Sequence, residues 1–263
     1  MLTTIIIAKN EEQYLQNCLN SVKNISSQII VVDNGSTDRT VTIAQSNNCT
    51  IISSQEPSFA LRREIGLQKA LHPWVLYIDA DERLTAELEI EIKYIINSKE
   101  NKITNYIINR KDYYFGSEWP AFSPVHRLFL REYLLGWQGI VHESPRVNGQ
   151  TGTLHNYLIH LTHTDLNSML RSTLRWSDYE AKLRFDSQHP PIIWWRLIRV
   201  ILTGWWNSFY VQKGYQKGTL GWVESLYQGF SLFITYAKLW ELQNQEQIRK
   251  AYEKLEQPFQ QSK

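Results

Sequence analysis

Two aspartates separated by one residue, Asp79 and Asp81, are the side chains in this sequence best suited to hold a metal ion. Carboxylate oxygens are ligands that Mg²⁺ and Mn²⁺ prefer, and an ion held by only two of them keeps positions for phosphate oxygens. Such an ion would stabilise a departing diphosphate. Aspartate is also common in turns as a purely structural residue, so the pair alone does not distinguish the two roles.

The elements around this pair are those of an α/β protein. Asp79 follows an apolar run, residues 74–78, which predicts a central, buried strand. Short β-branched runs alternate with helical stretches over the first hundred residues, as in a parallel sheet with crossover helices. We predict strands at 5–8, 29–32, 50–53 and 74–78, and helices at 58–71 and 85–97. The aspartates then lie at the carboxyl end of a strand, where open sheets bind their ligands.

Beyond residue 97 the alternation of strands and helices stops. Aromatic-rich, strand-like pieces follow at 105–109, 127–131 and 157–161, and apolar spacing predicts a helix at 165–184. We therefore predict an α/β domain over residues 1–165 and a helical, basic and aromatic region over 166–263.

Bulk properties restrict the partners and the location. The chain has 263 residues and a net charge of only +2, which gives no reason to expect nucleic acid as a partner. The N-terminus lacks the features of a signal peptide, and no stretch has the roughly 20 uninterrupted apolar residues of a spanning helix. We predict a cytoplasmic protein.

The helical region has an unusual composition. No acidic residue occurs between Asp186 and Glu224, and basic side chains there alternate with tryptophans. The basic residues are Arg196, Arg199, Lys213 and Lys217, and the tryptophans are Trp194, Trp195, Trp205, Trp206 and Trp222. This pattern is typical of proteins that bind the headgroup layer of an anionic membrane peripherally. The alternative is that the aromatic residues only pack the tail against the rest of the protein.

Four separated motifs, taken together, resemble those of family 2 glycosyltransferases, which have the GT-A fold. They are Ala8-Lys9-Asn10-Glu11, Val32-Asp33-Asn34-Gly35-Ser36-Thr37-Asp38, Arg63, and Tyr77-Ile78-Asp79-Ala80-Asp81-Glu82. The resemblance covers residues 1 to about 165 and implies a Rossmann-like mixed sheet with helices on both faces. It also implies a nucleotide-sugar half, about 1–100, and an acceptor half, about 101–165.

The resemblance implies roles for individual residues. Asp33 would accept a hydrogen bond from the uracil imide, and Arg63 would bind the diphosphate, which suits a carboxylate and a guanidinium respectively. Asp79 and Asp81 would hold the metal, with Asp81 as the principal ligand. The neighbouring Arg62 is expected to lie in solvent. The full predicted nucleotide-sugar site is Ala8, Lys9, Asn10, Glu11, Asp33, Arg63, Asp79, Ala80 and Arg127.

A further segment resembles a subgroup that includes lipopolysaccharide-core glucosyltransferases. It consists of Arg127-Leu128-Phe129 followed by Gly139-Ile140-Val141-His142-Glu143. We predict Glu143 as the base that accepts the proton of the attacking hydroxyl, with His142 as the rival because an imidazole titrates nearer neutrality. An ordinary loop is the alternative. His160 matches a recurrent histidine of the subgroup that could complete the metal shell, although a strand histidine is more often a core residue.

Together these resemblances imply an inverting, metal-dependent enzyme that uses Mg²⁺ or Mn²⁺. It would transfer a sugar from a UDP-sugar to a glycolipid, lipopolysaccharide or surface-polysaccharide acceptor at the inner face of the cytoplasmic membrane. Glucose is the sugar that we expect. Two alternatives stay open. The acceptor could be a protein or peptide, or the chain could be a sugar-nucleotide-binding protein without catalytic activity.

Overall fold

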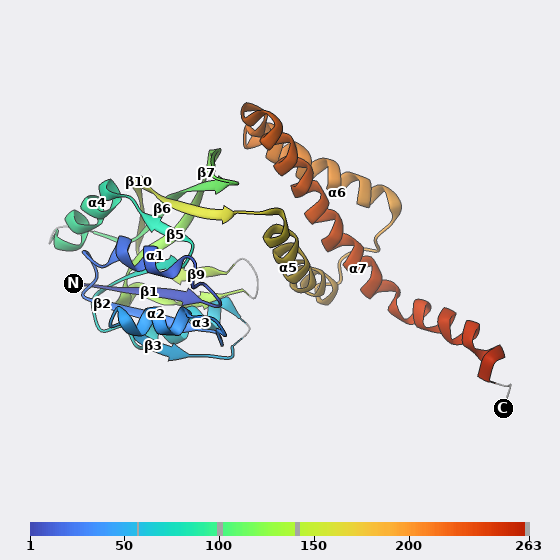
Figure 1. The fold of residues 1–263 in the computed structure, drawn as a ribbon, viewed down its shortest axis with the longest axis horizontal. Coiled ribbons are helices and arrows are strands. Elements are labelled where there is room, and N and C mark those ends of the chain that lie inside the picture. The colour runs from blue at the N-terminus through green and yellow to red at the C-terminus, as the bar shows by residue number, and fades with distance from the viewer. Residues whose placement is uncertain (57, 99–101, 140–142, 261–263) are drawn as a thin grey trace. The chain divides into compact units, whose positions relative to one another are not determined.

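The computed structural model describes residues 1–56, 58–98, 102–139 and 143–260 (Figure 1). The chain divides into two compact units, Met1–Thr164 and Asp165–Lys263. The first unit is mixed α/β and the second is helical. The predicted fold class is thus confirmed, and each unit is described by itself below.

A mixed, eight-stranded sheet is the centre of the first unit, in the order β3-β2-β1-β4-β7-β6-β10-β5. The strands are β1 (Leu2–Ala8), β2 (Gln28–Asp33), β3 (Thr50–Ser53), β4 (Trp74–Asp79), β5 (Glu82–Leu84), β6 (Ile103–Tyr114), β7 (Ser117–Leu130) and β10 (Gln150–His163). The strands β1 to β4 pair in parallel, as predicted. The strand β7 runs antiparallel to both β4 and β6. The strand β10 is parallel to β6 and antiparallel to β5.

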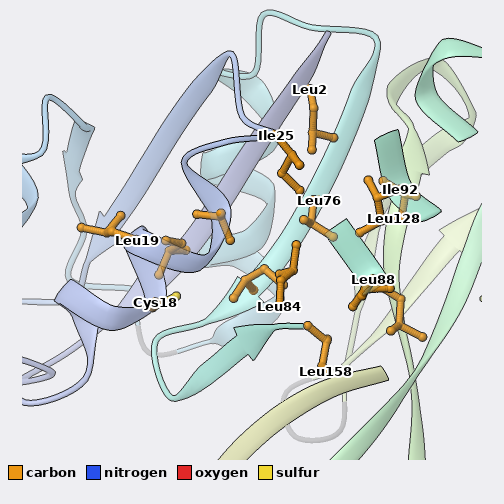
Figure 2. Packing of buried hydrophobic residues seen from close by; sticks show 14 of the residues in the cluster. Leu2, Cys18, Leu19, Ile25, Leu76, Leu84, Leu88, Ile92, Leu128 and Leu158 are labelled. Atoms are coloured by element: carbon orange, nitrogen blue, oxygen red, sulfur yellow. The ribbon is translucent and has the colours of Figure 1, made fainter. Parts of the chain in front are cut away.

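Helices cover both faces of this sheet. They are α1 (Leu15–Val22), α2 (Thr40–Ser46), α3 (Phe59–Gln68) and α4 (Ala86–Asn97). Leu19 of α1 and Leu88 of α4 pack in one apolar cluster with Leu76 of β4 (Figure 2). Leu67 of α3 packs in a second cluster, on the other face. A separate hairpin of β8 (Leu134–Gln138) and β9 (Ser144–Val147) follows the short 3-10 helix Arg131–Tyr133 and adds Leu134 to the second cluster.

The alternation of side chains along β4 directs Asp79 toward one face. Leu76 and Ile78 belong to the cluster that contains α1 and α4, whereas Val75 and Tyr77 belong to the cluster that contains α3. Because side chains alternate across a strand, Asp79 follows Val75 and Tyr77 onto the α3 side. The pattern of the strand therefore decides which helix can supply partners to this carboxylate.

The helical unit contains α5 (Leu166–Asp186), α6 (Trp194–Trp206), a π-helical segment Asn207–Val211, a 3-10 turn Gly214–Lys217 and α7 (Gly218–Gln260). Asp165 caps α5 by accepting from the Ser168 N–H at 2.9 Å. The helices α6 and α7 approach closely at Gly204, since a Cβ on this residue would lie 2.9 Å from the Gln228 carbonyl oxygen. In the described part of the chain no helix is long and apolar enough to span a bilayer.

Candidate functional site

The carboxylate of Asp79 lies between two arginines from different elements. Arg63, on α3, places Nη2 3.2 Å from Asp79 Oδ1, and Arg127, on β7, donates a short hydrogen bond to Oδ2. Each arginine side chain is only 5% exposed. Burial opposes the ionisation of Asp79, but the charges of Arg127 and Arg63 outweigh it and hold the pKa of this carboxyl below its usual range. Asp79 is therefore a carboxylate that two buried cations neutralise.

Aromatic rings hold the Arg63 guanidinium in place. Its Cζ lies 4.9 Å from the ring centroid of Trp137 and 5.5 Å from that of Tyr77. The two rings contact each other edge to face, with centroids 4.9 Å apart. Cation–π contacts of this kind restrain a guanidinium without using its N–H groups. Arg63 thus keeps hydrogen-bonding capacity for the groups in front of it.

A second carboxylate, that of Glu82 on β5, holds Arg127 from another side. The Glu82 side chain is fully buried, and its Oε1 accepts from Arg127 Nη2 at 2.6 Å. Arg110 Nη1 lies 3.4 Å from the same oxygen, and Oε2 accepts from the Asp79 backbone N–H at 2.9 Å. Glu82 therefore fixes both Arg127 and the turn that carries Asp79.

A cleft of about 340 Å³ opens in front of these groups. Its lining consists of Arg63, Asp79, Arg110, Arg127, Trp137 and Glu143 together with residues 124–126, 144 and 145. Several buried nitrogens of the lining have no hydrogen-bond partner among the described residues, and Arg63 Nη1 and Arg127 Nε are among them. Buried donors are normally satisfied, and a guanidinium is well matched to phosphate oxygens. The cleft can therefore accept an anion.

The predicted base lies in this cleft. Glu143 Oε1 accepts from Arg63 Nε at 2.9 Å, and 17% of the Glu143 side chain is exposed. The contact joins residues 80 positions apart in the chain. The rival His142 lies outside the described residues, and the choice between the two stays a prediction.

The predicted metal ligands fall into two places. Asp81 Oδ2 lies 3.2 Å from His160 Nε2, whereas the Asp79 carboxylate contacts arginines. The backbone N–H of Leu161 donates to the Asp81 carbonyl at 3.0 Å, which brings His160 beside Asp81. Burial opposes protonation of His160, but the charge of Asp81 and the hydrogen bond to Asp112 raise its pKa to about 9.

The pair of Asp81 and His160 fits a divalent ion that a substrate would help to hold. Two ligands of an octahedral ion with bonds of about 2.1 Å lie roughly 3 Å apart, close to the separation of these two atoms. No group of three or more His, Cys, Asp or Glu side chains converges as a metal site within the described part of the chain. The remaining positions would thus fall to phosphate oxygens and water, which is usual for Mg²⁺ at nucleotide sites. The predicted set of Asp79, Asp81 and His160 stays a prediction.

The segments predicted to border the uridine meet at the carboxyl ends of neighbouring strands. Ala8 is the register partner of Asp33, and Asn10 Oδ1 accepts from the Thr37 N–H at 2.8 Å. The Asp33 carboxylate accepts from the Gly35 N–H at 3.1 Å, so it shapes the turn after β2. Of the four residues 8–11, Ala8 is buried, Lys9 and Asn10 are exposed and Glu11 is half-buried. The contact of these residues with a nucleotide stays a prediction.

Two further predicted residues lie beside the network just described. Ala80 is buried, and its carbonyl accepts from Arg83 Nη1 at 2.7 Å. The expectation that Arg62 lies in solvent is wrong. Its side chain is buried, and the guanidinium lies 3.8 Å from the centroid of the Phe59 ring, three residues earlier on α3.

The structure adds site residues that were not predicted. Glu82 is the last residue of the motif that contains Asp79 and Asp81, but no role was predicted for it. No role was predicted for Arg110 and Asp112 either. The spacing of Arg110 and Asp112 could have indicated their role. Two charged residues at i and i+2 in a strand lie on the same face, and on a buried strand such a pair needs partners inside the protein. Their partners come from β5 and β10, and the spacing along the chain does not identify these strands as neighbours.

The family model and the relatives that this chain matches all indicate one family. Residues 3–135 match the model of glycosyl transferase family 2. An uncharacterized glycosyltransferase of Rickettsia typhi is 30% identical over 257 residues, which cover 92% of this chain and 87% of the relative. The lipopolysaccharide core biosynthesis glycosyltransferase LpsC of Rhizobium meliloti is 27% identical, over 91% of this chain and 92% of its own.

A solved structure of glucosyl-3-phosphoglycerate synthase from Mycobacterium tuberculosis, in complex with Mn²⁺, UDP and phosphoglyceric acid, is a more distant match. Its TM-score is 0.43 and its identity 15%, with coverage of 61% of this chain and 70% of that chain. The family match includes Asp79, Arg63 and Arg127, the residues at the centre of the cleft. The chain belongs to glycosyl transferase family 2 and is a glycosyltransferase.

Proposed function

We propose that this glycosyltransferase is an inverting enzyme that transfers glucose from UDP-glucose to a lipid-linked glycan and uses Mg²⁺ or Mn²⁺. The observation that carries the proposal is the cleft in which Arg63 contacts both Asp79 and Glu143. One buried cation there joins the predicted diphosphate site to the predicted base. A binding protein without catalytic activity would need the arginines but not the carboxylate of Glu143.

The chain's own residues support a single displacement. The acceptor hydroxyl oxygen would attack the anomeric carbon as the bond from that carbon to the UDP oxygen breaks, and the hydroxyl proton would pass to Glu143. Arg63 and Arg127 would donate hydrogen bonds to the diphosphate, which leaves with the bonding electrons. Donors already fixed by Tyr77, Trp137 and Glu82 need little reorganisation as this charge develops. The ion at Asp81 and His160 would supply further charge stabilisation for the diphosphate.

The helical unit supports a membrane-associated acceptor. Four apolar residues of α6, spaced four apart, are exposed: Trp194 by 73%, Ile198 by 50%, Leu202 by 57% and Trp206 by 55%. Residues i and i+4 lie on the same side of a helix, so these four form one stripe. The same helix carries Arg196 and Arg199, and each guanidinium lies 5.4 Å from the Trp195 ring centroid. We propose that this stripe enters the headgroup layer of an anionic membrane at the inner leaflet.

The donor is tested by thermal unfolding and transfer assays. We expect UDP-glucose with Mn²⁺ to raise the unfolding temperature more than GDP-sugars do, because a ligand bound only by the native state stabilises it. Transfer to glycolipid extracts is then assayed with radiolabelled UDP-glucose, with peptide substrates in parallel. Labelled peptide without labelled lipid would reject the lipid acceptor, and UDP-glucose binding without turnover on any acceptor or water would contradict the proposed transfer of glucose.

The membrane contact is tested by sedimentation with vesicles of phosphatidylglycerol and phosphatidylcholine. Replacing Trp194, Ile198, Leu202 and Trp206 by Ser should abolish sedimentation with anionic vesicles. Replacing the exposed Tyr252 and Leu255 on α7 by Ser is the control and should leave it unchanged. Equal sedimentation of the α6 variant and the wild type would reject the α6 stripe as a membrane-binding surface.

A further inference from the structure

Asp112, on β6, is a buried carboxylate to which the proposed reaction assigns no role. Only 7% of its side chain is exposed. It contacts three polar side chains, those of His160, Ser123 and Arg110. A buried carboxylate is costly unless several partners offset its desolvation, so an arrangement with three partners indicates that the position of this side chain matters.

The strands place Asp112 directly beside His160. The two residues are register partners in the parallel pairing of β6 and β10, and Asp112 Oδ1 lies 2.6 Å from His160 Nδ1. The second oxygen, Oδ2, accepts from the Ser123 hydroxyl at 2.6 Å, and Arg110 Nε lies 3.1 Å from Oδ1. Both carboxylate oxygens are therefore occupied, and the carboxylate plane is fixed.

This contact decides which imidazole nitrogen faces Asp81. An ionised carboxylate only accepts hydrogen bonds, so Asp112 requires a proton on His160 Nδ1. The other nitrogen, Nε2, then points to Asp81 Oδ2 at 3.2 Å. In a neutral imidazole with a protonated Nδ1, Nε2 carries the lone pair, and it is the nitrogen that a metal ion would bind.

We propose that Asp112 is a positioning residue that holds His160 in the Nδ1–H form and aims Nε2 at the cation site beside Asp81. Ser123 and Arg110 orient Asp112 in turn. The inference rests on the proposed function, because that function supplies the cation. Carboxylates that accept from a metal-bound histidine fix its tautomer and orientation, and their loss typically weakens metal affinity by about 10–100-fold.

The test is Mn²⁺ binding by the full-length chain in the presence of UDP, followed through the electron paramagnetic resonance signal of free Mn²⁺. We expect Asp112→Asn to raise the Kd for Mn²⁺ by about 10–100-fold. Glu118→Gln is the matched control. It removes a carboxylate of the neighbouring strand that pairs with Lys111 at 2.9 Å, and it should leave the Kd unchanged.

A second readout separates positioning from a general structural effect. In the Mg²⁺- and UDP-loaded protein, long-range ¹H–¹⁵N spectra should show His160 protonated at Nδ1 and unprotonated at Nε2, with the signals assigned by His160→Gln. Asp112→Asn should lose this preference. Ser123→Ala, which removes one hydrogen bond to Asp112, should weaken Mn²⁺ binding by a few-fold and decides the question if Asp112→Asn does not fold.

The outcomes separate this inference from the proposed function. If the wild type binds Mn²⁺, Asp81→Asn does not, and Asp112→Asn or Ser123→Ala binds like the wild type, the positioning role is overturned while the cation site stands. If the wild type itself does not bind Mn²⁺ with UDP, the cation site fails and the positioning role fails with it.

Discussion

Arg63 Nε donates a hydrogen bond of 2.9 Å to Glu143, and Nη2 of the same guanidinium lies 3.2 Å from Asp79. The group proposed to bind the diphosphate is thus also the partner of the proposed base. A diphosphate that binds Arg63 would compete with Glu143 for its N–H groups and leave this carboxylate available to the acceptor hydroxyl. Donor binding and activation of the acceptor would then be linked through one side chain.

Replacing Glu143 by Gln should lower the turnover number by about 10²–10⁴-fold, the range typical for loss of a general base. UDP binding should stay within a few-fold of wild type, since Gln keeps the shape of Glu and the guanidinium of Arg63 is also held by Asp79 and Trp137. Single-turnover transfer and calorimetric titration with UDP measure the two effects. A rate close to wild type would exclude Glu143 as the base.

Arg63→Lys should weaken UDP binding by about 10–100-fold. A lysine keeps the charge but loses the planar fork, and hydrogen bonds to charged groups are worth about 1.5–3 kcal/mol. Calorimetric titration with UDP and Mn²⁺ gives the Kd. Arg249→Lys, at an exposed ion pair of α7 with Glu253, is the control. Unchanged affinity in both variants would remove Arg63 from the diphosphate site.

Arg127→Met should lower the free energy of unfolding by about 3–5 kcal/mol, because it leaves the fully buried Glu82 carboxylate without its 2.6 Å partner. Adding Glu82→Gln should restore part of this loss, because it removes a buried negative charge that then has only the weaker 3.4 Å contact to Arg110. Arg249→Met disrupts an ion pair in which both side chains are more than half exposed, and it should cost less than about 1 kcal/mol. Urea unfolding compares the variants. A double variant no more stable than Arg127→Met would contradict the role of the buried charge.

His163 should make stability fall in acid. Burial, and after it the charge of His160, lower the pKa of His163 to about 4 in the folded protein, whereas an unfolded histidine titrates near 6.5. Between these values the unfolded chain binds a proton that the folded protein does not bind, so the stabilising difference is complete above pH 6.5 and declines as the pH falls toward 4.

The variant His163→Gln isolates this effect in metal-free protein with EDTA. From pH 7 to pH 5 the free energy of unfolding of the wild type should fall relative to that of the variant. The fall is about 1.4 kcal/mol for each pH unit below 6.5, on the order of 2 kcal/mol in total. Urea unfolding at the two pH values measures the difference. Parallel losses in the two proteins would contradict a depressed pKa at His163.

Periodicity in the sequence predicted much of the fold. The parallel strands, the helices near Phe59–Gln68 and Ala86–Asn97, and the helix Leu166–Asp186 are found where apolar spacing and capping residues place them. The lengths of β6 and β10 were not predicted. Each runs well beyond its apolar stretch because pairing with the other strand, through several register shifts, stabilises polar residues as strand.

The site was predicted as a set of motifs but not as a network. Asp79 and Arg63 meet because β4 directs its odd-numbered side chains toward α3, which follows from strand alternation. The partners of Glu82 and His160 depend instead on which distant strands are neighbours in the sheet. Local patterns carry little information on such pairings. They also did not predict the burial of Arg62, whose guanidinium lies over the Phe59 ring.

We propose that Asp81 and its neighbours hold a cation on which departure of the diphosphate depends. The most direct measurement is the Mn²⁺-dependent release of UDP from UDP-glucose, followed for the wild type and for Asp81→Asn at saturating donor. We predict a rate that rises with Mn²⁺ and is removed by EDTA in the wild type, and a loss of at least 10²-fold in Asp81→Asn. Equal rates in the two proteins, or a wild-type rate that EDTA leaves unchanged, would contradict the claim.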